Sequence, residues 1–214
     1  MKRLFLAICL RGASGPVYHH QQRGASVSLQ TLGAGIVRLY MPDRNGNLGD
    51  VVLGFDDPAL YTDPDLGYQG LVVGRWANRI RGAAFDFQGQ TYHTPMNQGQ
   101  WTLHSGGRMS FHLWQVVNTT ENSITFSRFS PDMEDGFPGN FTLQVTYTLT
   151  EENTLRLAYR VDSDRDTVAN PTNMCTLICP ATRQRPLRVM CSPSTLIGLR
   201  RRTTTNCPPA SWAT

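Results

Sequence analysis

The sequence predicts an all-β protein, an antiparallel β-sandwich, and three observations favour this class. Residues 141–150 and 154–162 alternate apolar and polar side chains with period two, which is typical of half-buried strands joined as a hairpin. Other short apolar segments are bounded by turn residues at similar intervals. No segment shows the 3.6-residue apolar period of a helix longer than a turn or two. The 214 residues suffice for one sizeable β domain or two small ones.

The remaining elements follow from the same pattern. Residues 26–43 predict two strands that are broken at 33–35, a Gly-Ala-Gly run. Asn45-Gly46 predicts a turn with positive φ angles, because both residue types tolerate that region. Residues 50–55 predict a further strand, and residues 83–94 a hairpin that turns at Gln88-Gly89.

The composition changes abruptly at Met174. Residues 174–214 hold six arginines and no Asp, Glu or Lys, whereas the residues before them hold the other 14 basic and all 16 acidic residues. Four of the five cysteines also lie in this tail, with no nearby histidine at ligand spacing, so they make a poor structural zinc site. The tail shows neither strand nor helix period and reads as irregular. We therefore divide the chain into an irregular, weakly signal-like N-terminal segment at 1–14, a β domain at 15–173 and an aberrant tail at 174–214.

Location and macromolecular partners follow from charge and hydropathy. No run of about 18 apolar residues exists, so no membrane partner is expected. Met1–Gly15 resembles a weak signal segment, but Arg11 stands where a small-residue cleavage site would follow, so we expect a cytoplasmic protein, with export as the alternative. The arginine-rich tail leaves nucleic-acid binding as an alternative function. The body has no basic stripe or aromatic-basic motif, so we expect no nucleic-acid partner.

Two loops place polar side chains among apolar ones. In the first, residues 74–82, Asn78 and Arg79 lie between Trp76 and Ile80. An arginine there can donate a fork of hydrogen bonds to vicinal hydroxyls or a carboxylate, or pair with an acid as an ordinary strand-edge residue. In the second, residues 101–114, His104 precedes a flexible Ser-Gly-Gly and can bond a sugar oxygen or transfer a proton. The alternative is that His104 is a satisfied structural group, while His112 is expected to be a solvated loop residue.

A third loop, residues 131–141, contains Glu134 and Asp135 in a tight acidic turn. A calcium loop would need more oxygen ligands at regular spacing, so this turn is interpreted as structural and no metal site is predicted. Trp76 lies in the first of these loops, and Trp101 and Trp114 lie at the ends of the second. Flat apolar rings stack on sugar faces, so these residues indicate a carbohydrate ligand.

Five segments together resemble the aldose 1-epimerase (galactose mutarotase) family over about residues 15–173. They are 33-GAGIVRLYMPDRNGNLGDVVLGFDD-57, 74-GRWANRIRGAAF-85, 103-LHSGG-107, 134-EDGFPGNF-141 and 170-NPTN-173. The resemblance implies a galactose mutarotase-like supersandwich, here truncated to its N-terminal half. It implies the interconversion of α and β anomers of free hexoses such as galactose or glucose by general acid–base ring opening, with no cofactor. It also implies that Asn78, Arg79 and His104 bind the substrate.

The chain departs from the family pattern at two positions. Ser105 interrupts the usual L-H-G-G loop, and Met174 occupies the position of the acid histidine that follows P-T-N. A thioether has no transferable proton, and the catalytic Glu belongs to a C-terminal half that this chain lacks. We therefore expect no catalytic residue and little or no activity; the alternative function is a non-catalytic carbohydrate-binding β-sandwich.

The genetic code offers an explanation of the tail. If one base is restored before the Met174 codon, 174-MCTLICPA-181 can regroup to H-V-Y-F-D-L-S-G, which supplies the family's histidine and an aromatic strand. The same shift converts the arginine and threonine runs at 200–205 into proline and acidic residues. The hypothesis is that the chain is read in a shifted frame after Asn173.

Overall fold

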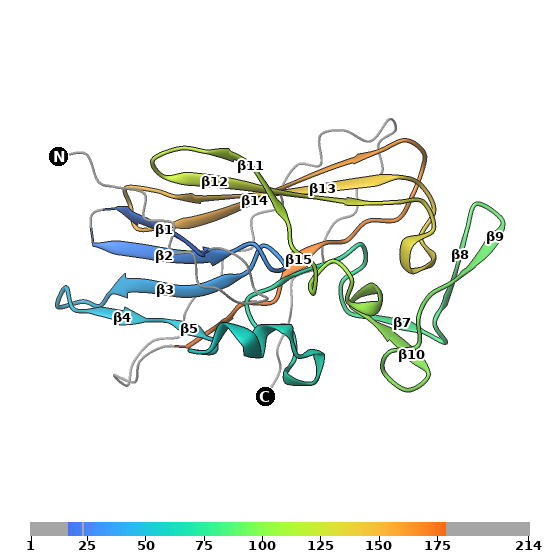
Figure 1. The fold of residues 1–214 in the computed structure, drawn as a ribbon, viewed down its shortest axis with the longest axis horizontal. Helices are drawn as coiled ribbons and strands as arrows, with labels where there is room; N and C mark the ends of the chain where they lie inside the picture. The colour runs from blue at the N-terminus through green and yellow to red at the C-terminus, as the bar shows by residue number, and fades with distance from the viewer. Residues whose placement is uncertain (1–16, 23, 179–214) are drawn as a thin grey trace.

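The computed structural model describes residues 17–22 and 24–178, and two four-stranded antiparallel sheets dominate this part of the chain (Figure 1). The first sheet has the order β1 (Val17–Gln22), β2 (Ala25–Gln30), β3 (Ile36–Pro42), β4 (Leu48–Asp50). The second has the order β11 (Gln115–Thr119), β12 (Ser123–Ser130), β13 (Phe141–Leu149), β14 (Leu155–Ser163). Figure 1 shows the second sheet lying across the first as a separate layer. The all-β sandwich predicted from the sequence is confirmed.

The two sheets bury one shared apolar core. Strand β13 alternates buried and half-buried side chains along its whole length, as its period-two pattern predicts. Phe126 of β12 contacts Tyr18 of β1 edge to face, with ring centroids 6.2 Å apart, and Tyr147 of β13 in the same manner at 6.0 Å. Val27 and Leu29 of β2 pack into the same cluster. The Tyr18–Phe126 contact therefore crosses between the two sheets, and the shared apolar cluster joins them into a sandwich.

Shorter strands and single turns extend the sandwich. β7 (Arg79–Arg81) pairs with β10 (Trp101–Leu103), and β8 (Ala84–Phe87) pairs with β9 (Gln90–His93); all four lie at one end of the sandwich (Figure 1). β5 (Val52–Leu53) pairs with β16 (Thr176–Leu177), and β6 (Val72–Val73) with β15 (Thr172–Asn173). The described helices are single 3-10 turns: η1 (Pro58–Thr62), η2 (Pro64–Leu66), η3 (His104–Gly106) and η4 (Glu134–Gly136).

Most predicted turns are confirmed, with two corrections. Gln88 and Gly89 have φ angles of 50° and 78° and close the β8–β9 hairpin as predicted. Gly46 has a φ of 85°, but Asn45 is not among the positive-φ residues, so the prediction of two such angles in that turn is wrong. The strand expected at 50–55 is divided in the structure: Asp50 ends β4, and only Val52–Leu53 form β5.

Strand pairing continues past Asn173. The Met174 N–H donates to the Leu71 carbonyl at 2.9 Å, and the Gly70 N–H donates to the Met174 carbonyl at 3.2 Å. Strand β16 follows, so the first residues of the predicted tail are part of the sheet structure. The segment 1–14, Cys179, Cys191, Cys207 and the arginines of the tail lie outside the described residues. In the part of the chain that the structure covers, no helix is long and apolar enough to cross a membrane.

Candidate functional site

The pairing of β7 with β10 brings together the three residues predicted to bind substrate. Asn78 precedes β7, Arg79 begins it, and His104 follows β10 directly. The register pairs Leu103 with Arg79. Across the end of this ribbon the His104 N–H donates to the Asn78 carbonyl at 3.0 Å. In return the Asn78 N–H donates to Nδ1 of His104 at 3.0 Å. Residues 26 positions apart in sequence are thus held at one point.

These bonds define the chemistry of His104. Because Nδ1 accepts a hydrogen bond, the neutral ring carries its proton on Nε2. The side chain is buried, and this desolvation, with a smaller contribution from the positive charge of Arg79, lowers its pKa to about 4. His104 is therefore neutral at pH 7, and its Nε2–H can donate a hydrogen bond. Tyr68 packs against the ring edge to face, with centroids 4.6 Å apart.

The backbone of the site is held in an uncommon conformation. Asn78, His104 and Ser105 have φ angles of 67°, 51° and 56°, in the left-handed region that L side chains seldom adopt. Such residues cost of order 1–3 kcal/mol each and persist where neighbouring contacts fix them. Ser105 provides such a contact: its Oγ accepts from the Trp76 N–H at 2.8 Å and donates to the Trp76 carbonyl at 3.1 Å. The residue that departs from the family loop therefore ties that loop to the 74–82 segment.

Arg79 is exposed and oriented by neutral partners. Its Nε donates to Oε1 of Gln98 at 2.7 Å, and its Nη1 donates to Oδ1 of Asn78 at 3.0 Å. No carboxylate among the described residues forms an ion pair with it. The expectation of an ordinary strand-edge arginine paired with an acid is therefore wrong. The guanidinium keeps its charge and free donors for a ligand.

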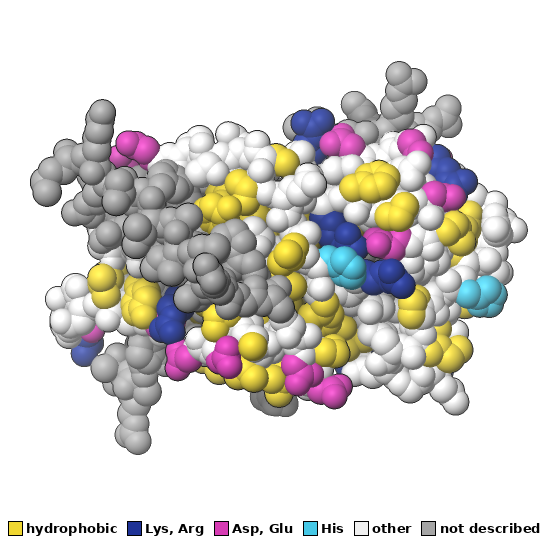
Figure 2. All heavy atoms as spheres, in the orientation of Figure 1, with side chains coloured by type: hydrophobic (Ala, Val, Ile, Leu, Met, Phe, Trp, Pro, Cys, Tyr) yellow, Lys and Arg dark blue, Asp and Glu magenta, His cyan; other side chains and the backbone are white. Residues whose placement is uncertain are grey.

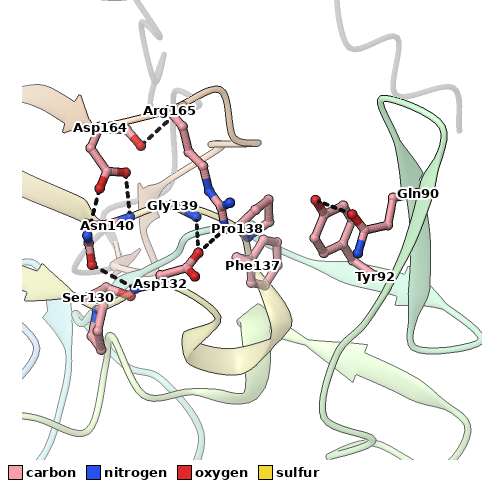
Figure 3. A network of polar contacts seen from close by, with 12 residues as sticks. Gln90, Tyr92, Ser130, Asp132, Phe137, Pro138, Gly139, Asn140, Asp164 and Arg165 are labelled. Atoms are coloured by element: carbon pink, nitrogen blue, oxygen red, sulfur yellow. Dashed lines mark hydrogen bonds and ion pairs between the residues drawn. The ribbon is translucent and has the colours of Figure 1, made fainter.

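A closed loop, residues 131–140, lies beside the site. Asp132 accepts a bond from the Gly139 N–H at 2.6 Å, and the Asp132 N–H donates to Oδ1 of Asn140 at 3.0 Å. Asn140 in turn donates through its backbone and side-chain nitrogens to Asp164, at 2.9 and 2.7 Å (Figure 3). Arg165 forms an ion pair with Asp132. The loop ends are thereby fixed to each other and to the segment after β14.

The buried guanidinium of Arg75 organises the same loop from within. Its donors reach Oγ and the carbonyl of Ser130, and the carbonyls of Pro131, Phe137 and Pro138, at 2.8–3.4 Å. Burial lowers the pKa of Arg75 to about 10, so it remains charged at neutral pH. A charge inside the fold is tolerated here because carbonyl oxygens occupy its donors.

Asp135 adds a buried carboxyl next to the site, a role that the sequence did not predict. It forms an ion pair with Nε of Arg108 at 3.1 Å, and an added Cβ at Gly106 would lie 3.5 Å from its Oδ1. Burial, with the negative charge of Glu134, raises the pKa of Asp135 to about 6. Figure 2 shows a histidine on this face beside basic and acidic side chains. The acidic turn is structural, as predicted, but it also brings a titratable group to the site.

The structure separates the three candidate tryptophans. Trp114 is buried, and its Nε1 donates to the Met109 carbonyl at 2.8 Å, so its proposed link to carbohydrate is wrong. Trp76 is half-buried, whereas Trp101 is 40% exposed. His112 is exposed, as expected. Within residues 17–22 and 24–178, no group of His, Cys, Asp or Glu could hold a metal ion.

Residue 174, where the family resemblance implies an acid histidine, is held in place by its neighbours. Asn173 donates from Nδ2 to the Gly70 carbonyl at 2.7 Å and to Oη of Tyr147 at 3.2 Å, and its Oδ1 accepts from the Cys175 N–H at 2.8 Å. Met174 lies between these contacts and is 37% exposed. The structure thus places a thioether, which carries no transferable proton, on a well-anchored backbone.

Comparisons with known proteins show which family the chain resembles. A family model described as aldose 1-epimerase matches residues 16–187. Rat galactose mutarotase is 37% identical over 166 residues, which cover 77% of this chain and 48% of that protein. Aldose 1-epimerase of Escherichia coli K12 is 34% identical over 152 residues, or 70% of this chain and 43% of that one.

A solved structure gives the same result. The aldose epimerase homologue from C. elegans is 31% identical with a TM-score of 0.71, and the match covers 75% of this chain and 50% of that chain. The chain spans about half the length of the curated relatives that it matches. By sequence and by fold, the chain belongs to the aldose 1-epimerase family, whose members are isomerases called mutarotases.

Proposed function

We propose that the chain binds a free aldose, a hexose such as galactose or glucose, through Asn78, Arg79 and His104. The observation that carries the proposal is the hydrogen bond from the Asn78 N–H to Nδ1 of His104. It directs the only ring proton of a neutral histidine to Nε2, where it can be donated to a sugar oxygen. Arg79 presents a planar fork suited to vicinal hydroxyls. The names of the relatives support an aldose as the ligand.

We further propose that these residues bind the sugar without driving rapid turnover. Anomer exchange through the open chain needs a proton taken from the C1 hydroxyl and another delivered to the ring oxygen. His104 has a pKa of about 4 and is a weak base that carries no acidic imidazolium proton at pH 7. Met174 supplies no proton in place of the family's acid. One positioned acid or base contributes typically about 10²–10⁴-fold, so its loss is a large deficit.

Polarimetry on fresh α-galactose, paired with a binding titration, tests both statements. We expect galactose binding that is lost in His104→Ala, with a rate of anomeric equilibration close to the spontaneous rate. Catalysed equilibration well above that rate would overturn the second proposal and leave the first. Absence of binding to galactose and glucose alike would overturn the first. Arg156→Gln serves as a control, because Arg156 is exposed on β14.

The shifted reading frame after Asn173 accounts for Met174 in this proposal. It requires a nucleotide sequence in which one restored base converts the Met174 codon to a histidine codon. It also requires an open frame downstream that encodes the aromatic strand. The coding sequence around codons 173–175 decides the matter. If these codons cannot regroup to histidine, Met174 is the residue that this protein has acquired in its own frame.

A further inference from the structure

The outward face of the β7–β10 ribbon carries a group of side chains that extends beyond the candidate sugar site. Ile80 and Thr102 are buried, so their neighbours Arg79, Arg81 and Trp101 face the opposite, exposed side of the ribbon. The register places Trp101 directly across from Arg81. Arg81 is two residues, or about 6.6 Å, along the strand from Arg79. The second arginine therefore lies roughly one sugar ring away from the first.

Among the residues that the structure describes, the two arginines of this face have no acidic partner. Five other described arginines lie within ion-pair distance of a carboxylate: Arg38, Arg108, Arg128, Arg160 and Arg165. Arg79 bonds to the amides of Gln98 and Asn78, and Arg81 lies over the Trp101 ring with its Cζ 6.0 Å from the ring centroid. Amide and ring contacts orient a guanidinium without neutralising it. Both charges are thus available to an anion.

The electrostatic environment of His104 agrees with this charge balance. Apart from burial, the influence on the pKa of His104 is the positive charge of Arg79, which lowers it further. Asp135, a buried acid beside this loop, is paired with Arg108. The candidate site is therefore electropositive on its β7 side, which is not needed for a neutral hexose.

We propose that Arg81, oriented by Trp101 and adjacent to Arg79, forms an outer subsite for an anionic substituent on the bound aldose. A carboxylate or a phosphate presents two oxygens to the planar guanidinium fork, and such paired bonds are stronger than neutral ones. The proposal rests on the proposed aldose site, which would hold the sugar ring while Arg81 binds the anionic group. Galacturonate and galactose 6-phosphate represent the two sources of that charge.

The test is a titration of the 214-residue chain with galactose, galacturonate and galactose 6-phosphate, followed by ligand NMR. We expect at least one anionic sugar to bind about ten-fold more tightly than galactose at low salt, which corresponds to about 1.4 kcal/mol. The advantage should shrink when the salt concentration rises from about 0.01 M to about 1 M, because the screening length falls from about 30 Å to about 3 Å. The anionic sugar that gains more affinity over galactose shows whether the subsite fits a carboxylate or a phosphate.

Variants locate the effect. Arg81→Gln should remove the anion preference and leave galactose affinity unchanged, and Arg81→Lys should restore only part of it, because an ammonium lacks the fork. Arg156→Gln, the same change of charge on β14, should preserve the preference. Equal affinities for galactose and both anions would overturn the outer subsite alone, as would a preference that survives Arg81→Gln. Failure to bind any of the three sugars would overturn the proposed function and this inference with it.

Discussion

The backbone N–H of Asn78 donates to Nδ1 of His104 at 3.0 Å, and the N–H of His104 donates to the carbonyl of Asn78 at the same distance. This reciprocal pair fixes both the tautomer and the orientation of the imidazole in the absence of a ligand. Because the ring is also desolvated, it remains neutral until the solution is strongly acidic. The site therefore contains a preorganised hydrogen-bond donor, and the energetic effects of that arrangement can be measured.

Replacing His104 should reduce the dependence of the free energy of unfolding on pH at acidic pH. The unfolded chain protonates His104 near its ordinary pKa of 6.5, whereas the folded protein resists protonation until about pH 4. Stability is therefore lost as pH falls through this window, by at most about 1.4 kcal/mol per pH unit. His104→Asn removes the titration and keeps an acceptor for the Asn78 N–H. Urea unfolding between about pH 6.5 and 4 measures the slope; an unchanged slope would contradict the buried, neutral histidine.

The titration of Asp135 should change stability with pH in the direction opposite to that of His104. Its folded pKa of about 6 lies above its ordinary value of 3.8, so the folded protein holds the extra proton in between. Its contribution to stability is complete below the lower value and is lost as pH rises toward 6. In the parent protein, the loss of stability with rising pH that Asp135 causes opposes the gain that His104 causes. Asp135→Asn should therefore leave the His104 slope unopposed and make the protein more acid-sensitive. Asp65→Asn, at an exposed carboxyl, is the control and should show the parent profile.

The β13–β14 hairpin could be predicted from sequence because its signals, alternating side chains and a turn, lie within one short segment. Residues 141–149 bury every second side chain, and a polar turn separates them from β14. The preceding pair, β11 and β12, was not predicted. β11 is largely exposed and its pairing shifts register between Val116 and Asn118, so apolar alternation gives little signal there.

The candidate site was predicted only in part. Its three sugar-binding candidates came from a family resemblance, because their positions in sequence do not show that β7 pairs with β10. The roles of Ser105 and Asp135 depend on left-handed backbone angles and on burial by distant segments. One local signal existed in the Ser-Gly-Gly that follows His104, which indicated an unusual loop. It did not show that the inserted hydroxyl would bond to the backbone of Trp76.

The Ser105 hydroxyl should stabilise the loop by more than an ordinary surface bond. Ser105→Ala leaves the N–H and carbonyl of Trp76 without their present partner, at a cost of about 1–3 kcal/mol for a buried group. Ser105→Gly loses the same bonds but relieves the left-handed φ of 56°, so it should be less destabilising than the alanine variant. Thermal and urea unfolding of both variants measure the difference. An alanine variant as stable as the parent would show that the hydroxyl does not hold the loop.

Arg75 should tolerate no substitution, including lysine. Its fork satisfies carbonyls of Ser130, Pro131 and Pro138 at once, whereas an ammonium offers three donors from a single point. Arg75→Lys is expected to destabilise the fold by about 2–4 kcal/mol, and Arg75→Met by at least as much, because the carbonyls stay buried without partners. Hydrogen exchange of the 131–140 amides provides a local measurement. If those amides remain protected in Arg75→Met, the loop is closed by the Asp132 and Asn140 bonds alone.

Tyr147 and Asn173 should be energetically coupled, because the Tyr147 hydroxyl bonds both to the Ala34 carbonyl and to the Asn173 side chain. Oη of Tyr147 donates to the Ala34 carbonyl at 2.6 Å and accepts from Nδ2 of Asn173 at 3.2 Å. Tyr147→Phe keeps the ring in the core and removes only the hydroxyl, so we expect a loss of about 1–2 kcal/mol. Asn173→Ala should cost more, since it also frees the Gly70 carbonyl and the Cys175 N–H.

In the double variant the two losses should fall short of additivity by about 0.5–1 kcal/mol, because the shared bond can be lost only once. Strict additivity would show that the 3.2 Å contact contributes nothing to stability. The two single variants also test what holds the backbone next to Asn173. If Asn173 holds residue 174 in place, Asn173→Ala should increase hydrogen exchange at the Met174 amide, which donates to Leu71, while Tyr147→Phe should increase it less. Equal exchange in both variants would assign the anchoring of Met174 to the β6–β15 pairing rather than to the side chain of Asn173.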